Sequence, residues 1–186
     1  MADPKVNQQG NFVGGDMAGG DIHKTIIVPT DNKYLGDLYQ KLQAEIDGNA
    51  QVRELIENLE HYTNRIPGDT IGLEVKLTDG QRTDLLSFAA RTKELFSKKL
   101  LRYQFFESAQ KIYLFLLAQV YTRYHNSVYP LIQSNQPPTT VNQAIQSQII
   151  DPIEKMLGKN MLDLCSDEIN GILYFLTGNC HIKWTK

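Results

Sequence analysis

Apolar residues near the N-terminus recur at every fifth position, with glycine and short polar residues beside them. The apolar row is Phe12, Met17, Ile22 and Ile27, and the neighbouring slots hold Gly10, Gly15 and Gly20 and then Asn11, Asp16 and Asp21. A helix needs a period of 3.6 residues and a flat strand a period of 2, so neither accounts for this pattern. The period predicts a chain that turns a corner every few residues, with Gly and Asn or Asp supplying the positive φ.

This repeat predicts a device for self-association. Two or three such units cannot bury their own apolar row, because repeat units need stacked neighbours. We therefore expect the row to meet copies on other chains, and a square layer with one unit per side favours a tetramer. A flexible tail and a calcium-binding repeat are the alternatives, although calcium-binding Gly/Asp repeats have a different spacing. The residues expected to carry self-association are Phe12, Gly15, Asp16, Met17, Gly20, Asp21 and Ile22.

The remainder of the chain has the apolar periodicity of helices. Ile22 to Val28 is apolar and β-branched, which predicts a short strand, and Pro29 to Asn32 then form a hinge. Helices are predicted at about residues 35–46, 50–66, 80–103, 104–132, 141–157 and 166–178. The predicted fold is mainly α, with a helical domain of five or six helices at 31–186 behind a short Gly-rich β arm at 1–30.

Two prolines fall inside predicted helices, and large apolar side chains occupy the C-terminal tail. Pro130 is expected to kink or end the helix at 104–132, and Pro152 to bend or split the helix at 141–157. The helix at 104–132 carries aromatic residues on more than one side, which predicts a central position and favours an oligomer interface. Trp184 favours an ordered, buried tail.

Composition and charge narrow the class of protein. The 186 residues are 41% apolar, and 19 basic against 21 acidic side chains give a net charge of −2. This balance gives no general affinity for nucleic acid or an anionic membrane. Two cysteines, Cys165 and Cys180, form no framework and suit a reducing cytoplasm. Because no segment has the character of a signal peptide or a membrane span, we expect a cytoplasmic protein without a membrane partner.

Candidate catalytic and metal-binding residues do not form a coherent site. Cys180 and His181 could begin a zinc site, which needs four ligands. The other candidate ligands are Cys165, His23, His61 and His125. They are scattered without ligand-pair spacing, and no nucleophile elbow or phosphate-binding glycine loop is present in the sequence. The sequence therefore predicts no catalytic residue, no metal site, no cofactor and a protein that is not an enzyme.

A basic stretch lies between Arg91 and Lys111. Within it, Arg91, Lys98 and Arg102 recur at spacings of seven and four residues, so they share one face of a helix. Such a face could meet DNA phosphates, an acidic protein partner or only water. Because the whole chain is nearly neutral, partner docking or plain solvation is favoured. A DNA-contacting regulatory module that uses the basic helix around residues 91–111 is the alternative function.

Three segments together carry a resemblance to a known family. They are Gly14-Gly15-Asp16-Met17-Ala18-Gly19-Gly20-Asp21, then 76–85 continued by 93–100, and finally 167–184, which closes with Leu-Thr-Gly-Asn-Cys-His-Ile-Lys-Trp. From about residue 10 to its end, the chain resembles the C-terminal domain of effector subunits in bacterial ABC three-component defence systems. This group overlaps Lamassu-type antiphage immunity.

The resemblance implies a protein that works with two others. One partner is an ATPase resembling the SMC and Rad50 proteins, which senses foreign DNA, and the other is a small middle component. This chain would therefore meet DNA only indirectly. The domain usually follows an effector such as a nuclease, and here the effector is expected to be encoded separately, to be missing, or to have been trimmed from the chain. The residues expected to bind partners are Arg91, Lys98, Arg102, His181, Lys183 and Trp184.

Overall fold

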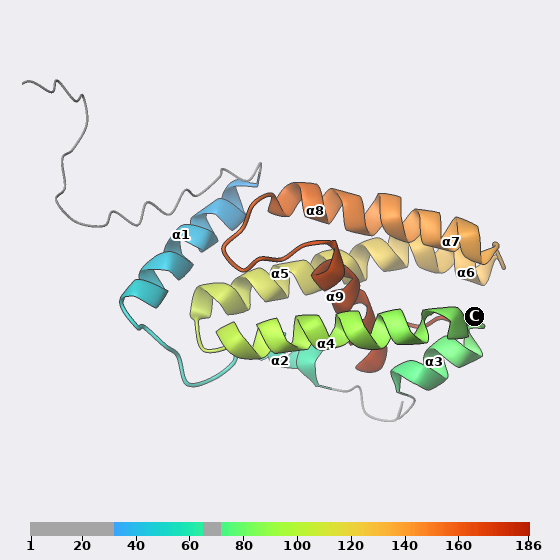
Figure 1. Ribbon diagram of the computed structural model, residues 1–186, viewed down its shortest axis with the longest axis horizontal. Helices are drawn as coiled ribbons and strands as arrows, with labels where there is room; N and C mark the ends of the chain where they lie inside the picture. The colour runs from blue at the N-terminus through green and yellow to red at the C-terminus, as the bar shows by residue number, and fades with distance from the viewer. Residues whose placement is uncertain (1–31, 65–71) are drawn as a thin grey trace, which may run out of the picture.

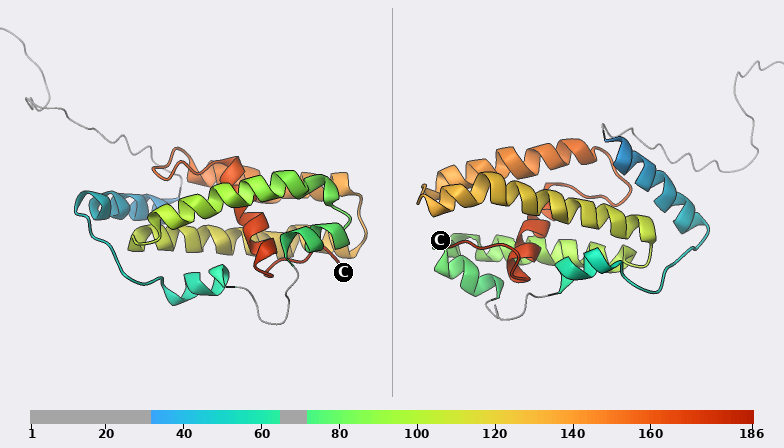
Figure 2. Two further views of the ribbon diagram at one scale, coloured as in Figure 1. Left: turned by 60° about the horizontal axis from the view of Figure 1, so that its bottom comes forward. Right: turned by 180° about the vertical axis from the view of Figure 1, so that it is seen from behind.

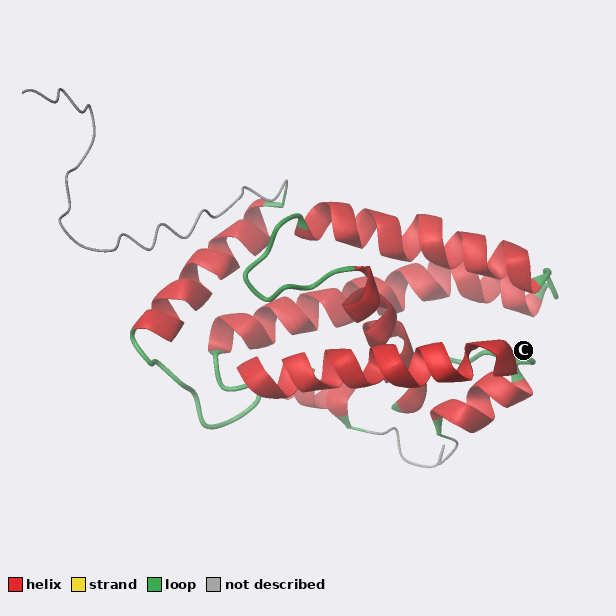
Figure 3. Cartoon of the chain, viewed as in Figure 1, coloured by secondary structure: helices red, strands yellow, loops and turns green. Residues whose placement is uncertain are grey.

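The computed structural model describes residues 32–64 and 72–186, and these residues form a mainly helical domain (Figure 1). The predicted fold class is therefore confirmed for the body of the chain. The predicted arm at 1–30, with its strand and every residue assigned to self-association, lies outside the described residues. Within the two described ranges no residue belongs to a strand (Figure 3).

The helices follow one another through short connections. In chain order they are α1 (Lys33–Asp47), α2 (Glu57–Thr63), α3 (Leu73–Asp79), the 3-10 turn η1 (Thr83–Leu85), α4 (Leu86–Tyr103), α5 (Glu107–Arg123), the π-helical turn η2 (Tyr124–Val128), α6 (Tyr129–Gln133), α7 (Pro138–Ile145), the π-helical turn η3 (Gln146–Ile150), α8 (Asp151–Leu157) and α9 (Ser166–Gly178). Among the helices that the structure describes, none combines the length and the apolar character needed to span a bilayer.

α9 occupies the centre of the core because it is apolar on nearly every side. It crosses between α4 on one side and the α5–α6 and α7–α8 rods on the other (Figure 2). Such a helix is stable only where all its faces are covered, and every residue from Gly171 to Gly178 is buried. A Cβ at Gly171 would lie 2.3 Å from the carbonyl oxygen of Thr92 on α4. The missing side chain therefore sets how closely these two helices pack.

The start of α9 is fixed by a buried carboxylate. The helix begins at Ser166 as predicted, but Cys165 rather than Ser166 occupies the N-cap position. The Cys165 N–H donates to the Glu168 carboxylate at 3.0 Å, and Lys99 pairs with that carboxylate at 3.1 Å. Burial alone would raise the pKa of Glu168, but these hydrogen bonds outweigh it and hold that pKa below its usual value.

The two internal prolines lie just after π-helical turns. η2 and η3 end two residues before Pro130 and Pro152 respectively. A proline removes a backbone donor and crowds the preceding turn, and a wider turn relieves both problems. The expected interruptions therefore appear as local changes in hydrogen bonding. In Figure 1 the rods α5–η2–α6 and α7–η3–α8 each continue past their proline.

The predicted helix at 50–66 is wrong over its first half, because residues 50–56 are not helical. The buried amide of Gln110 on α5 holds this segment instead. It accepts from the Ile56 N–H at 2.6 Å and donates to the Glu54 carbonyl at 3.0 Å. These tertiary hydrogen bonds outweigh the apolar stripe, and only α2 remains helical. The predicted end of this helix at residue 66 lies outside the described residues.

The predicted helix at 80–103 begins later than expected, at Leu86, and the sequence pattern missed α3 before it. Gly80 ends α3, and Gln81 then adopts a left-handed backbone with φ of 57°. The chain therefore turns sharply between α3 and α4. This α3–α4 turn carries Arg82 into the interior.

Candidate functional site

The second and third segments of the family resemblance meet at one end of the domain. Gly80 lies against the tail, and a Cβ at this position would lie 2.7 Å from the Cβ of Trp184. On another side of the tail, the Tyr124 hydroxyl donates to the Lys183 carbonyl at 2.6 Å. Sequence segments that are far apart in the chain thus form one packed unit.

Trp184 is 3% exposed and has partners for both its ring and its N–H. Tyr174 stacks on the indole with 6.2 Å between ring centroids and 11° between planes. The indole N–H donates to the Thr177 hydroxyl at 3.1 Å. Burial raises the pKa of Tyr174 to about 12.

Arg82 lies beside this tryptophan with its side chain only 5% exposed. Its guanidinium carbon is 5.5 Å from the centroid of the Trp184 ring, a cation–π distance. Nη2 donates to the amide oxygen of Asn142 at 2.7 Å, and Nε is 3.4 Å from the carboxylate of Asp84. Nη1 is buried and has no hydrogen-bond acceptor among the described residues. The guanidinium is therefore held in place by neutral contacts and one long ion pair.

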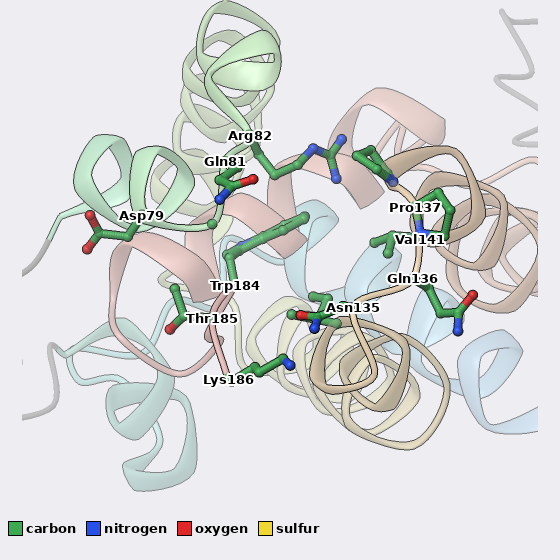
Figure 4. Close-up of a pocket in the computed structure, with 13 residues that line it drawn as sticks. Asp79, Gln81, Arg82, Asn135, Gln136, Pro137, Val141, Trp184, Thr185 and Lys186 are labelled. Atoms are coloured by element: carbon green, nitrogen blue, oxygen red, sulfur yellow. The ribbon is translucent and has the colours of Figure 1, made fainter.

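A pocket of about 480 Å³ opens beside this arginine (Figure 4). Its walls come from the α3–α4 turn, the α6–α7 connection, the start of α7 and the C-terminal tail. We call it the Arg82 pocket, and its wall includes Gln81, Arg82, Asn135, Pro137, Val141 and Trp184. In Figure 4 the Arg82 side chain extends across the pocket toward α7. The pocket thus places a buried cation next to a mixed polar and apolar wall.

Two histidine rings approach each other on another side of the tail. The rings of His61 on α2 and His181 are 5.3 Å apart between centroids. Burial lowers the pKa of His181, and the charges of His61 and Lys76 act in the same direction. In the part of the chain that the structure describes, no third Cys, His, Asp or Glu joins them. This pair therefore lacks the ligand number that zinc requires.

The basic residues predicted to share a helix face lie on the exposed side of α4. Arg91 pairs with Asp167 at 2.9 Å, and Lys98 pairs with Glu94 at 2.6 Å. Two of the three predicted cations are therefore matched by a nearby carboxylate. Their charge is spread over a face that also carries acidic groups.

Large apolar side chains stand exposed beside these cations at the C-terminal end of α4. Leu101 is 60% exposed, and Phe105, just beyond the helix end, is 42% exposed. Lys98, Leu101 and Arg102 share one face of α4 at spacings of three and four residues, and Phe105 follows in the turn after the helix. We call these four residues the docking strip. It combines two cations with two apolar groups that stay partly exposed in the described domain.

The structure separates the residues predicted to bind partners. Arg91, Lys98, Arg102 and Lys183 are exposed, whereas His181 and Trp184 are buried. The buried side chains pack inside the domain, so they are not part of an exposed docking surface. Arg82 was missed because its local pattern is that of a surface arginine. Its only sequence signal was its place inside the second segment of the resemblance.

Comparison with known proteins identifies this domain. The family model of C-terminal domain 9 of the ABC-three component (ABC-3C) systems matches residues 72–184, more than half of the chain. The matched span begins next to α3 and ends at Trp184, so it includes the docking strip and both sides of the Arg82 pocket. No curated protein and no solved structure matches the chain. The chain belongs to the family of C-terminal domain 9 of the ABC-3C systems.

Proposed function

We propose that this chain is a non-catalytic oligomerisation and docking subunit in an ABC-3C defence system against phage or plasmid DNA. Its partners would be an SMC/Rad50-like ATPase and a small middle component. Family membership supports a role as one component among several. The observation that carries the docking role is the docking strip, where two partly exposed apolar side chains lie beside two exposed cations.

The docking strip suits a protein partner better than a nucleic acid. Aromatic residues and Arg are enriched in interface cores, and a few such residues supply most of the binding energy. Burying Leu101 and Phe105 requires an apolar partner surface, which a phosphate backbone does not offer. Arg102 and Lys98 favour acidic groups around that surface. We therefore propose an ATPase-complex surface with an apolar centre and an acidic rim.

The rest of α4 supports this role by holding the strip in place. Phe96 and Leu100 on the opposite side are buried in the core, and Gly171 sets the close contact between α4 and α9. A rigid helix loses little conformational entropy when it binds. The strip is thus presented ready for a partner.

Co-expression with the genes of the complex, followed by affinity capture, tests the docking role. The unmodified chain should recover the ATPase and the small component. Leu101→Asp combined with Arg102→Glu should lose them while the melting temperature stays unchanged. Val75→Asp is the matched control, because Val75 is also an exposed apolar residue but lies on α3. Unchanged recovery by the double variant, or loss of the ATPase from the Val75 control alone, contradicts the proposed strip.

The self-association role rests on the five-residue pattern of the N-terminal arm. Deleting residues 1–22 should lower the number of chains per particle, which is expected to be four in the unmodified protein. The helical circular dichroism should stay unchanged. Phe12→Asp with Met17→Asp should have the same effect, whereas exchanging Gln8 and Gln9 for Asn should have none. If native mass measurements give the same number of chains per particle with and without the arm, this role is contradicted.

A further inference from the structure

We propose that the Arg82 pocket binds the carboxylate of a peptide segment, in which an aspartate or glutamate lies next to an apolar residue. This inference goes beyond the proposed function, because it concerns another site with its own ligand chemistry. It rests on the buried guanidinium, the charges around it and the make-up of the pocket wall.

The charge of Arg82 is poorly matched within the domain. Burying a cation is costly unless it is paired and hydrogen-bonded. The nearest carboxylate belongs to Asp84, which is 62% exposed and 3.4 Å away, so water weakens its attraction. The other acidic side chain at the pocket is Asp79, and Figure 4 shows it directed away from the cavity. An anion inside the pocket would supply the missing charge.

A second cation strengthens this preference. Lys186 also lines the pocket, and its ammonium turns toward Asn135 in Figure 4. Concave sites with low-dielectric walls concentrate the field of such charges. The guanidinium is already held by Asn142 and Trp184, so an oxyanion would meet an oriented partner. Nη1 is the guanidinium nitrogen without an acceptor among the described residues, so it is the donor left for a carboxylate oxygen.

The rest of the wall points to a peptide rather than a free anion. Pro137 and Val141 give an apolar surface for a neighbouring side chain. The amides of Gln81, Asn135 and Gln136 can bond the peptide backbone, since each has both a donor and an acceptor. A volume of about 480 Å³ lies within the usual range for ligand pockets. Inorganic phosphate carries the charge but would leave the apolar wall uncovered.

This site can be tested apart from the docking strip. α4 begins beside the pocket and ends at the strip, so the two lie at opposite ends of that helix (Figure 1). Trp184 is the single tryptophan of the chain, and its fluorescence therefore reports on this pocket alone. Titrations need only the full chain, without any partner of the proposed complex.

The probes are the blocked dipeptide acetyl-Leu-Glu-amide, its neutral counterpart acetyl-Leu-Gln-amide, and inorganic phosphate, all at constant ionic strength. The glutamate dipeptide should give a saturable change in Trp184 fluorescence. The glutamine dipeptide should bind at least about tenfold more weakly, since a hydrogen bond to a charged group is worth roughly 1.5 kcal/mol or more. Equal binding of the two dipeptides, no saturable response, or tighter binding of phosphate overturns the proposal.

Variants separate charge from folding. Arg82→Lys keeps the charge but loses the planar guanidinium, and it should weaken binding of the glutamate dipeptide several-fold. Because Arg82 is buried, the exposed rim residue Gln136 offers a second variant: Gln136→Glu adds a repelling charge and should also weaken binding. Gln133→Glu is its control, because Gln133 is exposed on α6 outside the pocket wall, and should bind like the unmodified chain. Unweakened binding by Gln136→Glu, or a Gln133 control weakened as much as Gln136→Glu, speaks against the pocket.

Discussion

The C-terminal tail (residues 179–184) and the docking strip on α4 differ in what covers their apolar side chains. Ile182 and Trp184 of the tail are buried, and Trp184 is covered by α9 and the α3–α4 turn, whereas Leu101 and Phe105 of the strip are exposed. Both regions contain apolar and basic residues. The difference shows that a distinctive string of residues can serve packing inside the domain.

Polar bonds reinforce this difference. The Asn179 amide donates to the carbonyls of Tyr62 and Thr63 at 3.1 and 3.2 Å, and Lys76 donates to the Ile182 carbonyl at 3.3 Å. These bonds tie the tail to α2 and α3. Changes in the tail should therefore lower the free energy of unfolding, and changes in the strip should weaken partner binding instead.

The largest expected effect is on the tail itself. Trp184→Ala should lower the free energy of unfolding by about 3–5 kcal/mol, because it removes a buried indole and leaves a cavity. Trp184→Phe is the control and should cost clearly less, since it keeps a ring against Tyr174. Urea denaturation measures both. A loss below about 1 kcal/mol for Trp184→Ala would mean that burial of Trp184 does not stabilise the domain.

Gly171→Ala should have the next largest effect on stability, because Gly171 lets α9 pack closely against α4, the helix that carries the strip. The added methyl group meets the Thr92 carbonyl oxygen at 2.3 Å, and overpacking of this kind costs about 1–3 kcal/mol. Gly72→Ala is the matched control, since a Cβ there has no atom within 4 Å. Thermal unfolding of the two variants should differ, and equal melting temperatures would contradict the close packing of α4 on α9.

Tyr124→Phe should have a smaller effect of about 1 kcal/mol. It removes only the hydroxyl that donates to the Lys183 carbonyl and keeps the buried ring. Tyr34→Phe serves as the control, because Tyr34 is half exposed, and should stay within about 0.5 kcal/mol of the unmodified chain. If the two variants unfold at the same denaturant concentration, the bond does not anchor the tail.

The pH dependence of stability should reveal His181, although the effect is modest. Its pKa is lowered in the folded domain, so the unfolded chain binds a proton more readily. Stability from this residue is thus complete above the unfolded pKa of about 6.5 and declines as the pH falls below it. His181→Gln should flatten the loss of melting temperature between about pH 7 and pH 5. An unchanged pH profile would contradict the burial of a neutral imidazole.

The smallest effect on stability is expected in the strip. Leu101→Asp should change the free energy of unfolding by no more than about 0.5 kcal/mol, because the side chain is largely in water already. The same variant should weaken capture of the ATPase complex. Chemical denaturation and affinity capture on one preparation measure both, and a loss of stability without a loss of capture would remove the contrast with the tail.

Local patterns predicted much of the helical body correctly. The apolar pattern at 35–46 predicted α1, and the pattern at 166–178 predicted α9. The same reasoning failed at 50–56, where Gln110 captures backbone groups that the stripe assigned to a helix. Hydrogen bonds from a distant element leave no trace in the local spacing of apolar residues, so the local pattern does not reveal them.

The sequence by itself determined the mainly α body, the membership in an ABC-3C domain family and the shared face of Arg91, Lys98 and Arg102. Only the tertiary structure decided that Arg82 lies beside Trp184 and that Leu101 stays exposed. The physical reason is that periodicity fixes which residues share a face of a helix. Whether that face is covered depends on elements that come from elsewhere in the chain.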